Sequence, residues 1–324
     1  MLKQQLKSTI RHALASLYYA TGNFKVSLQG KVAILMYHRV ISEKELKEQF
    51  IQPGMYVRDD IFELQMQFLK EYFHVLSFSE LLNIWKERVW DKEKRYCVIT
   101  FDDGWLDNYT NAYPILKKYN FPATIFLPTA LIDTDKWFWP DKMSYMMHHY
   151  FNNSASKQED SISLNKIDSA IQKYKESSDK EIEDIIEKMS RELNIKIPNE
   201  RMLLNWKEIE EMSKHGISFG SHTCNHKILT KLSTTEIKKE LKESLHTLEE
   251  KKINYVPAFC YPNGNYTHEI SEQVKGAGYQ AAVSTKFGYE NGGSKDLFGL
   301  KRIGIHNDIS STMPLFAYRL SKES

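Results

Sequence analysis

Short apolar runs alternate along this chain with segments whose apolar residues recur at helical spacing. Runs of strand length lie at residues 31–40, 96–101, 122–127, 217–220, 256–261, 281–284 and 301–305. Helical spacing is clear in residues 62–72, 106–119, 234–252 and 267–277. Unbroken apolar runs are typical of strands buried on both faces, and helices between them indicate a parallel sheet with helices outside. The pattern therefore predicts an α/β fold, either an open sheet or a barrel.

Residues 130–205 interrupt this alternation. They include an aromatic and Met-rich stretch, WFWPDKMSYMMHHY at 137–150, followed by helical segments rich in Lys and Glu at 166–194. We interpret the segment as an insertion folded over one end of the barrel. The predicted organisation is an N-terminal helical segment (1–30), a domain over 31–306 that carries the insertion, and a C-terminal tail (307–324).

The first 22 residues predict an amphipathic helix with basic residues. They lack the apolar core and the cleavage site of a signal peptide, and no stretch of the chain is apolar for long enough to cross a membrane. We expect either a surface helix docked on the domain or a helix lying at a membrane surface, with a cytoplasmic or peripheral inner-membrane location. The apolar positions are Leu2, Leu6, Ile10, Leu14 and Leu17, and the basic ones are Lys3, Lys7 and Arg11.

Charge and cysteine content exclude two classes of function. A net charge of +2 over 324 residues provides no basic stripe for nucleic acid. Cys97, Cys224 and Cys260 are odd in number and form no CxxC pair, which argues against a disulfide framework and against a thiolate zinc site. This cysteine usage favours a reducing compartment.

Two adjacent carboxylates end the strand predicted at 96–101, in the stretch ITFDDGW. Asp102 and Asp103 follow the strand directly, and Gly104 lets the chain turn sharply after them. Chemistry gathers at the carboxyl ends of strands in parallel β/α folds. An Asp that caps the following helix would explain one of the two residues. The second charge still needs a partner.

A pair of histidines follows another predicted strand, in the stretch SHTCNH. His222 and His226 are four residues apart, so on a helical turn both imidazoles point the same way. Two imidazoles and one Asp make three protein ligands and leave the coordination sphere of a divalent metal open, as in catalytic sites. One carboxylate would then bind the metal, while the other takes a proton from the attacking water.

These motifs resemble the polysaccharide deacetylases of the NodB-homology class, carbohydrate esterase family 4. TFDDG and the downstream His-Thr-x-x-His carry the resemblance, which covers about residues 31–128 and 206–306. ILMYHRV at 34–40 resembles the branch that deacetylates exopolysaccharides such as poly-N-acetylglucosamine. The resemblance implies a distorted (β/α) barrel of about seven strands.

The resemblance also implies a role for each site residue. Asp103, His222 and His226 would ligate a divalent metal, usually zinc, and Asp102 would be the general base. Either His38 or His306 would be the general acid that protonates the leaving amine, and His38 fits the MYHRV branch. A backbone N–H in the stretch Tyr261, Pro262 and Asn263 would stabilise the oxyanion. Trp105, Trp137 and Trp139 would contact the sugar or pack within the fold.

One motif departs from the family pattern. The third motif is often Arg-x-Pro-Tyr, with an Arg that orients the catalytic Asp, whereas this chain has Cys260 followed by Tyr-Pro-Asn-Gly. Another group must therefore hold Asp102. The implied function is metal-dependent hydrolysis of the N-acetyl group of an amino sugar in a surface glycan or its precursor. The alternatives are a catalytically weak glycan-binding protein on the same fold and a deformylase or deacetylase of a lipid-linked sugar.

Overall fold

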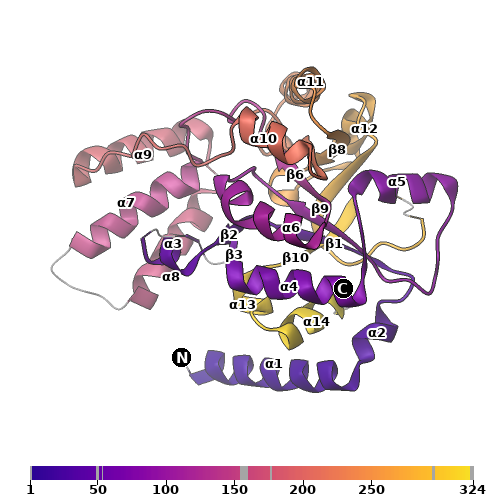
Figure 1. Cartoon of the computed structure of the whole chain (residues 1–324). Coiled ribbons are helices and arrows are strands. Elements are labelled where there is room, and N and C mark those ends of the chain that lie inside the picture. Colours follow the sequence, from indigo (N-terminus) through magenta and orange to yellow (C-terminus); the bar gives the residue numbers. More distant parts are fainter. Residues whose placement is uncertain are drawn as a thin grey trace.

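Parallel strands close a barrel at the centre of the protein (Figure 1). The computed structural model describes residues 2–48, 51–52, 54–153, 160–175, 177–293 and 296–321. Around the ring the order is β1, β10, β9, β8, β7, β6, β5, and β5 pairs again with β1. This ring confirms the (β/α) barrel of about seven parallel strands. Its strands are β1 (Val32–Tyr37), β5 (Tyr96–Phe101), β6 (Ala123–Leu127), β7 (Ile217–Ser221), β8 (Tyr255–Cys260), β9 (Ala281–Phe287) and β10 (Leu300–Gly304).

Three short strands make the barrel irregular. β4 (His74–Leu76) pairs with the first half of β5 and leaves the second half to β6. β2 (Arg39–Ile41) and β3 (Tyr56–Arg58) form a separate parallel pair. The single strand predicted over residues 31–40 is therefore two strands. His38 lies in the break between β1 and β2, where the chain leaves the barrel, and not inside a strand.

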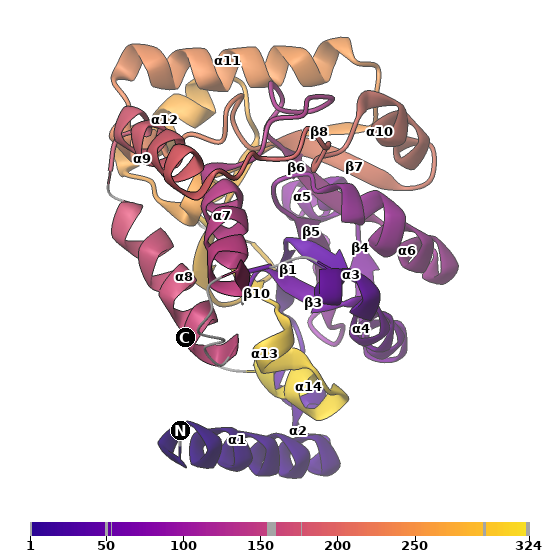
Figure 2. The ribbon, with the colours of Figure 1, turned by 90° about the vertical axis from the view of Figure 1, so that its left-hand side faces the viewer.

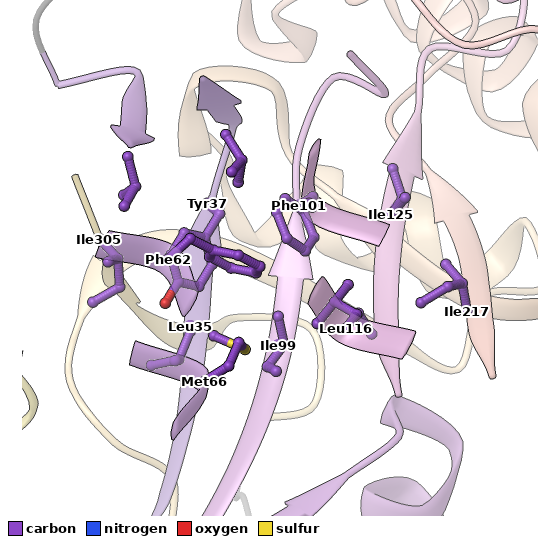
Figure 3. Close-up of a cluster of buried hydrophobic side chains, with 14 of the residues drawn as sticks. Leu35, Tyr37, Phe62, Met66, Ile99, Phe101, Leu116, Ile125, Ile217 and Ile305 are labelled. Atoms are coloured by element: carbon purple, nitrogen blue, oxygen red, sulfur yellow. The ribbon is translucent and has the colours of Figure 1, made fainter. Parts of the chain in front are cut away.

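Both faces of the barrel strands are apolar, which explains the unbroken apolar runs. Leu35 of β1 and Ile99 of β5 pack with Phe62 and Met66 from the helix outside the barrel (Figure 3). The residues next to them in sequence, such as Val98, belong to a second buried cluster. Successive side chains of a strand point to opposite faces, so both clusters draw on the same strands.

Helices cover the outside of the barrel. The helix predicted at 106–119 begins as a π-helical turn at Asn108–Ala112 and continues as α6. Short 3₁₀ turns lie at Leu229–Lys231 and Pro262–Gly264. The covering helices are α3 (Glu43–Glu48), α4 (Asp59–Tyr72), α5 (Phe78–Glu87), α6 (Tyr113–Tyr119), α10 (Trp206–Ser213), α11 (Thr234–Glu250) and α12 (His268–Gly276).

The predicted insertion contains three helices that stand together on one side of the barrel (Figures 1 and 2). They are α7 (Trp139–Asn153), α8 (Asp160–Tyr174) and α9 (Asp179–Leu193), and they pack around Met143, Ile167 and Ile171. Both ends of the insertion are attached to the loops that carry the two sequence motifs. The Ala130 amide donates to the Cys224 carbonyl, and the Leu204 amide donates to the Gly104 carbonyl.

Helices from the two ends of the chain pack against each other. They are α1 (Leu2–Thr21), α2 (Asn23–Ser27), α13 (Asn307–Ser310) and α14 (Met313–Ser321). The described part of the segment predicted as a C-terminal tail (307–324) is helical, and Leu315, Phe316 and Leu320 of α14 are buried. Among the described residues, no helix is both long enough and apolar enough to cross a membrane.

Candidate active site

The turn after β5 places both carboxylates at the mouth of the barrel. The Asp102 amide extends the ladder by donating to the Tyr37 carbonyl (2.9 Å). Asp103 and Gly104 then adopt left-handed conformations, with φ of 73° and 66°. A Cβ on Gly104 would lie 2.8 Å from a Leu127 methyl group, so this turn requires glycine. Both Asp side chains are buried.

The histidine pair lies on an irregular turn after β7 and not on a helical turn. Thr223 and His226 have φ of 65° and 57°, which a helix does not allow. Glu240 of α11 holds the turn, because one of its carboxylate oxygens accepts from the amides of Cys224 (2.8 Å) and Asn225 (3.0 Å). This buried Glu was not among the predicted site residues.

The turn nevertheless brings both imidazoles to Asp103. Asp103 Oδ1 lies 3.3 Å from His222 Nε2 and 3.2 Å from His226 Nε2. Burial alone would raise the pKa of Asp103, but the hydrogen bonds with the two histidines hold that pKa well below its usual value. These three groups are those expected as metal ligands, and their ligand atoms all lie within 4.8 Å of one another.

Neighbouring groups fix the orientations of Asp103 and His222 so that their ligand atoms are placed to bind a cation. His222 Nδ1 lies 2.7 Å from the Cys260 carbonyl, so Nδ1 carries a proton that it donates to this carbonyl, and Nε2 is the ring nitrogen that faces Asp103. The indole N–H of Trp105 donates to the other oxygen of Asp103 (3.1 Å). One carboxylate and two imidazoles suit a divalent metal such as zinc, so the donor set fits the implied cofactor.

Arg302 of β10 holds Asp102. Its two terminal nitrogens donate to the two carboxylate oxygens, each at 2.7 Å, and Nε donates to the Ser284 carbonyl (2.9 Å). Arg302 is 1% exposed and reaches the site beside Cys260, whose sulfur lies 3.2 Å from Nη2. Arg302 therefore holds Asp102 as the missing motif Arg was expected to do. In the sequence, the only indication of this role was a charged residue inside the strand predicted at 301–305.

His38 lies at the same mouth, with Nε2 4.0 Å from Asp102 Oδ2. The carbonyl of His38 accepts from the Asn108 side chain (2.8 Å). Asp107 accepts from Arg39 Nε (2.8 Å) and from the Val40 amide (2.9 Å), so the π-helical turn fixes the segment that carries His38. His306 instead contacts Asp308, with 3.4 Å between Nδ1 and Oδ2.

Comparison with known proteins assigns the family. Residues 90–282 match the family model described as polysaccharide deacetylase. This chain belongs to the polysaccharide deacetylase family. It is a carbohydrate N-deacetylase, a hydrolase acting on carbon–nitrogen bonds other than peptide bonds.

Individual relatives agree with this assignment. The chain is 31% identical over 217 residues to a poly-β-1,6-N-acetyl-D-glucosamine N-deacetylase of Staphylococcus epidermidis, which covers 60% of this chain and 73% of that protein. The structure of the Streptococcus pyogenes deacetylase PplD in complex with acetate is 25% identical, with a TM-score of 0.61 over 91% of this chain and 100% of that one. A polysaccharide deacetylase from Bacillus cereus shares the fold at 23% identity, with a TM-score of 0.58 over 90% and 69% of the two chains.

The stretch predicted to stabilise the oxyanion follows β8 in this deacetylase. The Tyr261 amide donates to the Val283 carbonyl, and the Tyr261 hydroxyl donates to the Phe298 carbonyl (2.9 Å), so this residue serves the fold. Pro262 has no N–H, and the Gly264 amide donates to the Tyr261 carbonyl. Asn263 is exposed in a left-handed conformation with φ of 57°.

The three tryptophans differ in their surroundings. Trp105 is 2% exposed, because the Arg39 guanidinium covers its ring at 4.5 Å, so a sugar contact does not suit it. Trp137 is half-buried and donates to the Glu200 carbonyl (2.8 Å), and Trp139 packs on the small core of the insertion. The aromatic residue of this stretch that reaches the site is Phe138, which lies between Trp137 and Trp139 in the sequence. The Phe138 ring is 4.8 Å from the His226 ring and was not predicted as a site residue.

Proposed function

We propose that this deacetylase hydrolyses the N-acetyl group of an amino sugar in a surface glycan or its precursor, using a divalent metal, zinc. The observation that carries the proposal is the pairing of two differently held carboxylates. Asp103 faces two imidazole nitrogens within 3.3 Å, while Asp102 is held by Arg302. The acetate bound to the Streptococcus pyogenes relative and the poly-N-acetylglucosamine named for the staphylococcal one support this substrate class.

Asp103, His222 and His226 would hold the metal. When bound there, such an ion polarises the substrate carbonyl and lowers the pKa of water. The indole of Trp105 and the Cys260 carbonyl orient the carboxylate and the first imidazole before any ion arrives. This preorganisation favours a cation at this point of the site.

Asp102 would act as the general base. Arg302 uses one lone pair on each of its oxygens, so the remaining lone pairs can accept a proton from the attacking water. Burial raises the pKa of Asp102, but the charge and hydrogen bonds of Arg302 outweigh burial and keep that pKa below its ordinary value. The carboxylate is therefore ionised at neutral pH and ready to take a proton.

His38 would donate the proton that the leaving amine needs. It lies beside Asp102 at the mouth of the barrel, whereas His306 contacts Asp308. For the oxyanion we favour the amide of Asn263, because the Tyr261 and Gly264 amides are already hydrogen-bonded. Because Arg302 holds Asp102, the missing motif Arg no longer argues for a binding protein without catalysis.

Acetate release from β-1,6-linked N-acetylglucosamine oligomers tests the proposal. Chelation should abolish release and zinc should restore it. Asp102→Asn should keep the bound metal, measured by elemental analysis, but lower kcat about 10²–10⁴-fold, as expected for loss of a general base. Asp103→Ala should lose both metal and turnover. Full activity of the Asp102→Asn enzyme would exclude this mechanism, and formate release from an N-formyl sugar with no acetate release would exclude the acetyl group.

A further inference from the structure

The N-terminal helix α1 docks on the protein through the side opposite its apolar stripe. Ala15 is fully buried at the contact. The Tyr18 ring lies edge-on to Tyr318 of α14 at 5.8 Å, and the Tyr19 ring stacks on Phe24 of α2 at 5.6 Å. Small and aromatic side chains therefore make this attachment, whereas the described aliphatic side chains of α1 are half or more exposed.

The aliphatic stripe of α1 faces outward. Ile10, Leu14 and Leu17 follow helical spacing and are 50%, 50% and 65% exposed. Val26 of the adjoining α2 is 72% exposed. In both views α1 is the outermost element at its end of the molecule, with no other element beyond it (Figures 1 and 2). Isolated exposed aliphatic residues are ordinary, but a stripe of them on one helix marks an interaction surface.

The charged residues in the sequence of α1 and α2 all have one sign. Residues 1–27 contain no Asp or Glu, although the whole chain has 42 acidic residues against 44 basic ones. Two copies of the chain meeting through α1 would bring like charges together, so self-association is disfavoured. An anionic lipid surface offers both an apolar boundary and negative headgroups. The basic residues of α1 and α2 are Lys3, Lys7, Arg11 and Lys25.

We infer that α1 is a lipid-binding helix that lies in the surface of an anionic membrane, with Ile10, Leu14 and Leu17 inserted at the headgroup boundary. The helix does not cross the bilayer and leaves the barrel outside it. The inference is independent of the proposed deacetylation, because α1 contributes no residue to the site described above.

Vesicle flotation of the full-length protein tests the inference. We expect binding to vesicles that mix phosphatidylglycerol with phosphatidylcholine, and about tenfold or more weaker binding to phosphatidylcholine alone. The variant Ile10→Glu/Leu14→Glu/Leu17→Glu should lose binding while retaining acetate release, since these side chains are half-exposed. Val89→Glu, at a position 64% exposed outside α1, is the matched control and should bind like the wild type.

Three results would overturn the inference. The wild-type protein could fail to float with anionic vesicles, or the triple variant could bind as well as the wild type. Light scattering after size exclusion could instead show a dimer that the triple variant abolishes, with no vesicle binding. That outcome would assign the stripe to a second copy of the chain. None of these measurements depends on turnover, so they stand apart from a failure of the proposed function.

Discussion

Arg302 has two effects on Asp102 that act on catalysis in opposite directions, since one aligns the base and the other makes it weaker. Its bidentate hydrogen bonds fix the carboxylate in one orientation, and its charge lowers the pKa and hence the basicity of Asp102. A weaker base that is always ionised and always aligned suits the proposed reaction, because a metal ion would also activate the attacking water. The pair is buried, so it is not screened by salt as a surface pair would be.

Replacing Arg302 with Lys should therefore change the pH dependence of the enzyme. A single ammonium cannot reproduce the bidentate contact, so burial dominates and the pKa of Asp102 rises. Because the reaction needs ionised Asp102, the acid limb of the kcat/KM profile should move to higher pH. Arg302→Met should lose more activity than Arg302→Lys, since it leaves the buried carboxylate unpaired. A reduced rate with an unmoved acid limb would limit Arg302 to a structural role.

The two candidate acids can be separated by a matched pair of variants. His38→Gln should lower kcat about 10²–10⁴-fold, because it removes the proton donor beside Asp102. His306→Gln should stay close to wild type, because this side chain contacts Asp308. Steady-state acetate release at neutral pH, with metal content measured in parallel, provides the comparison. The reverse ranking would assign the acid to His306.

Local motifs predicted some site residues and missed others for a physical reason. Asp102, Asp103, His222 and His226 lie in two short stretches whose chemistry can be read without the fold. Arg302 is 200 residues from Asp102 in the sequence, and only closure of the barrel brings the two together. Phe138 was hidden among neighbouring aromatic residues, because spacing alone does not tell which ring turns toward His226.

At the scale of elements, the position of His226 depends on α11. The turn from His222 to His226 contains two left-handed residues, and such strain persists only where the surroundings enforce it. Glu240 provides this support through three hydrogen bonds, two from backbone amides and one from the Asn225 side chain (2.8 Å). The helix thus supports the proposed metal site without supplying a ligand.

Glu240→Gln should weaken both the turn and the metal site. The NH₂ group of the Gln side chain would face N–H groups that need an acceptor, so at least one buried hydrogen bond is lost. We therefore expect a loss of about 1.5–3 kcal/mol in the free energy of unfolding. Zinc affinity should fall about 10–100-fold, as for other groups that orient metal ligands. Glu243→Gln on the exposed side of the same helix is the control. Chemical denaturation and competition with a chelator measure the two effects, and unchanged zinc affinity would separate Glu240 from the metal site.

Elements with unbroken apolar runs were predicted well, whereas α5 and the break at His38 were not. β5 has the predicted bounds, because all of its side chains are buried and its pattern is strong. α5 went unrecognised although Ser77 and Glu80 form a capping box at its start. The break at His38 was also missed, since it arises from hydrogen bonds with the distant Asn108 and Asp107.

At the scale of the whole molecule, barrel closure is a property that no single segment carries. Neighbouring strands from β5 to β10 pair in sequence order, which an open sheet would also allow. Closure requires β1 to pair with β5 on one side and β10 on the other. The hydrophobic pattern therefore left both architectures open, and the family resemblance decided between them.

The C-terminal helix α14 should contribute strongly to the stability of the whole barrel. Phe316 is fully buried and lies edge-on to Phe68 of α4 at 5.5 Å, in the same cluster as β1 and β5. Phe316→Ala should lower the free energy of unfolding by about 3–5 kcal/mol, because it removes a large apolar side chain and leaves a cavity. Val89→Ala, at an exposed position, should change it by less than about 0.5 kcal/mol. Urea denaturation of the two variants measures the difference, and equal stabilities would mean that residues 313–321 do form a dispensable tail.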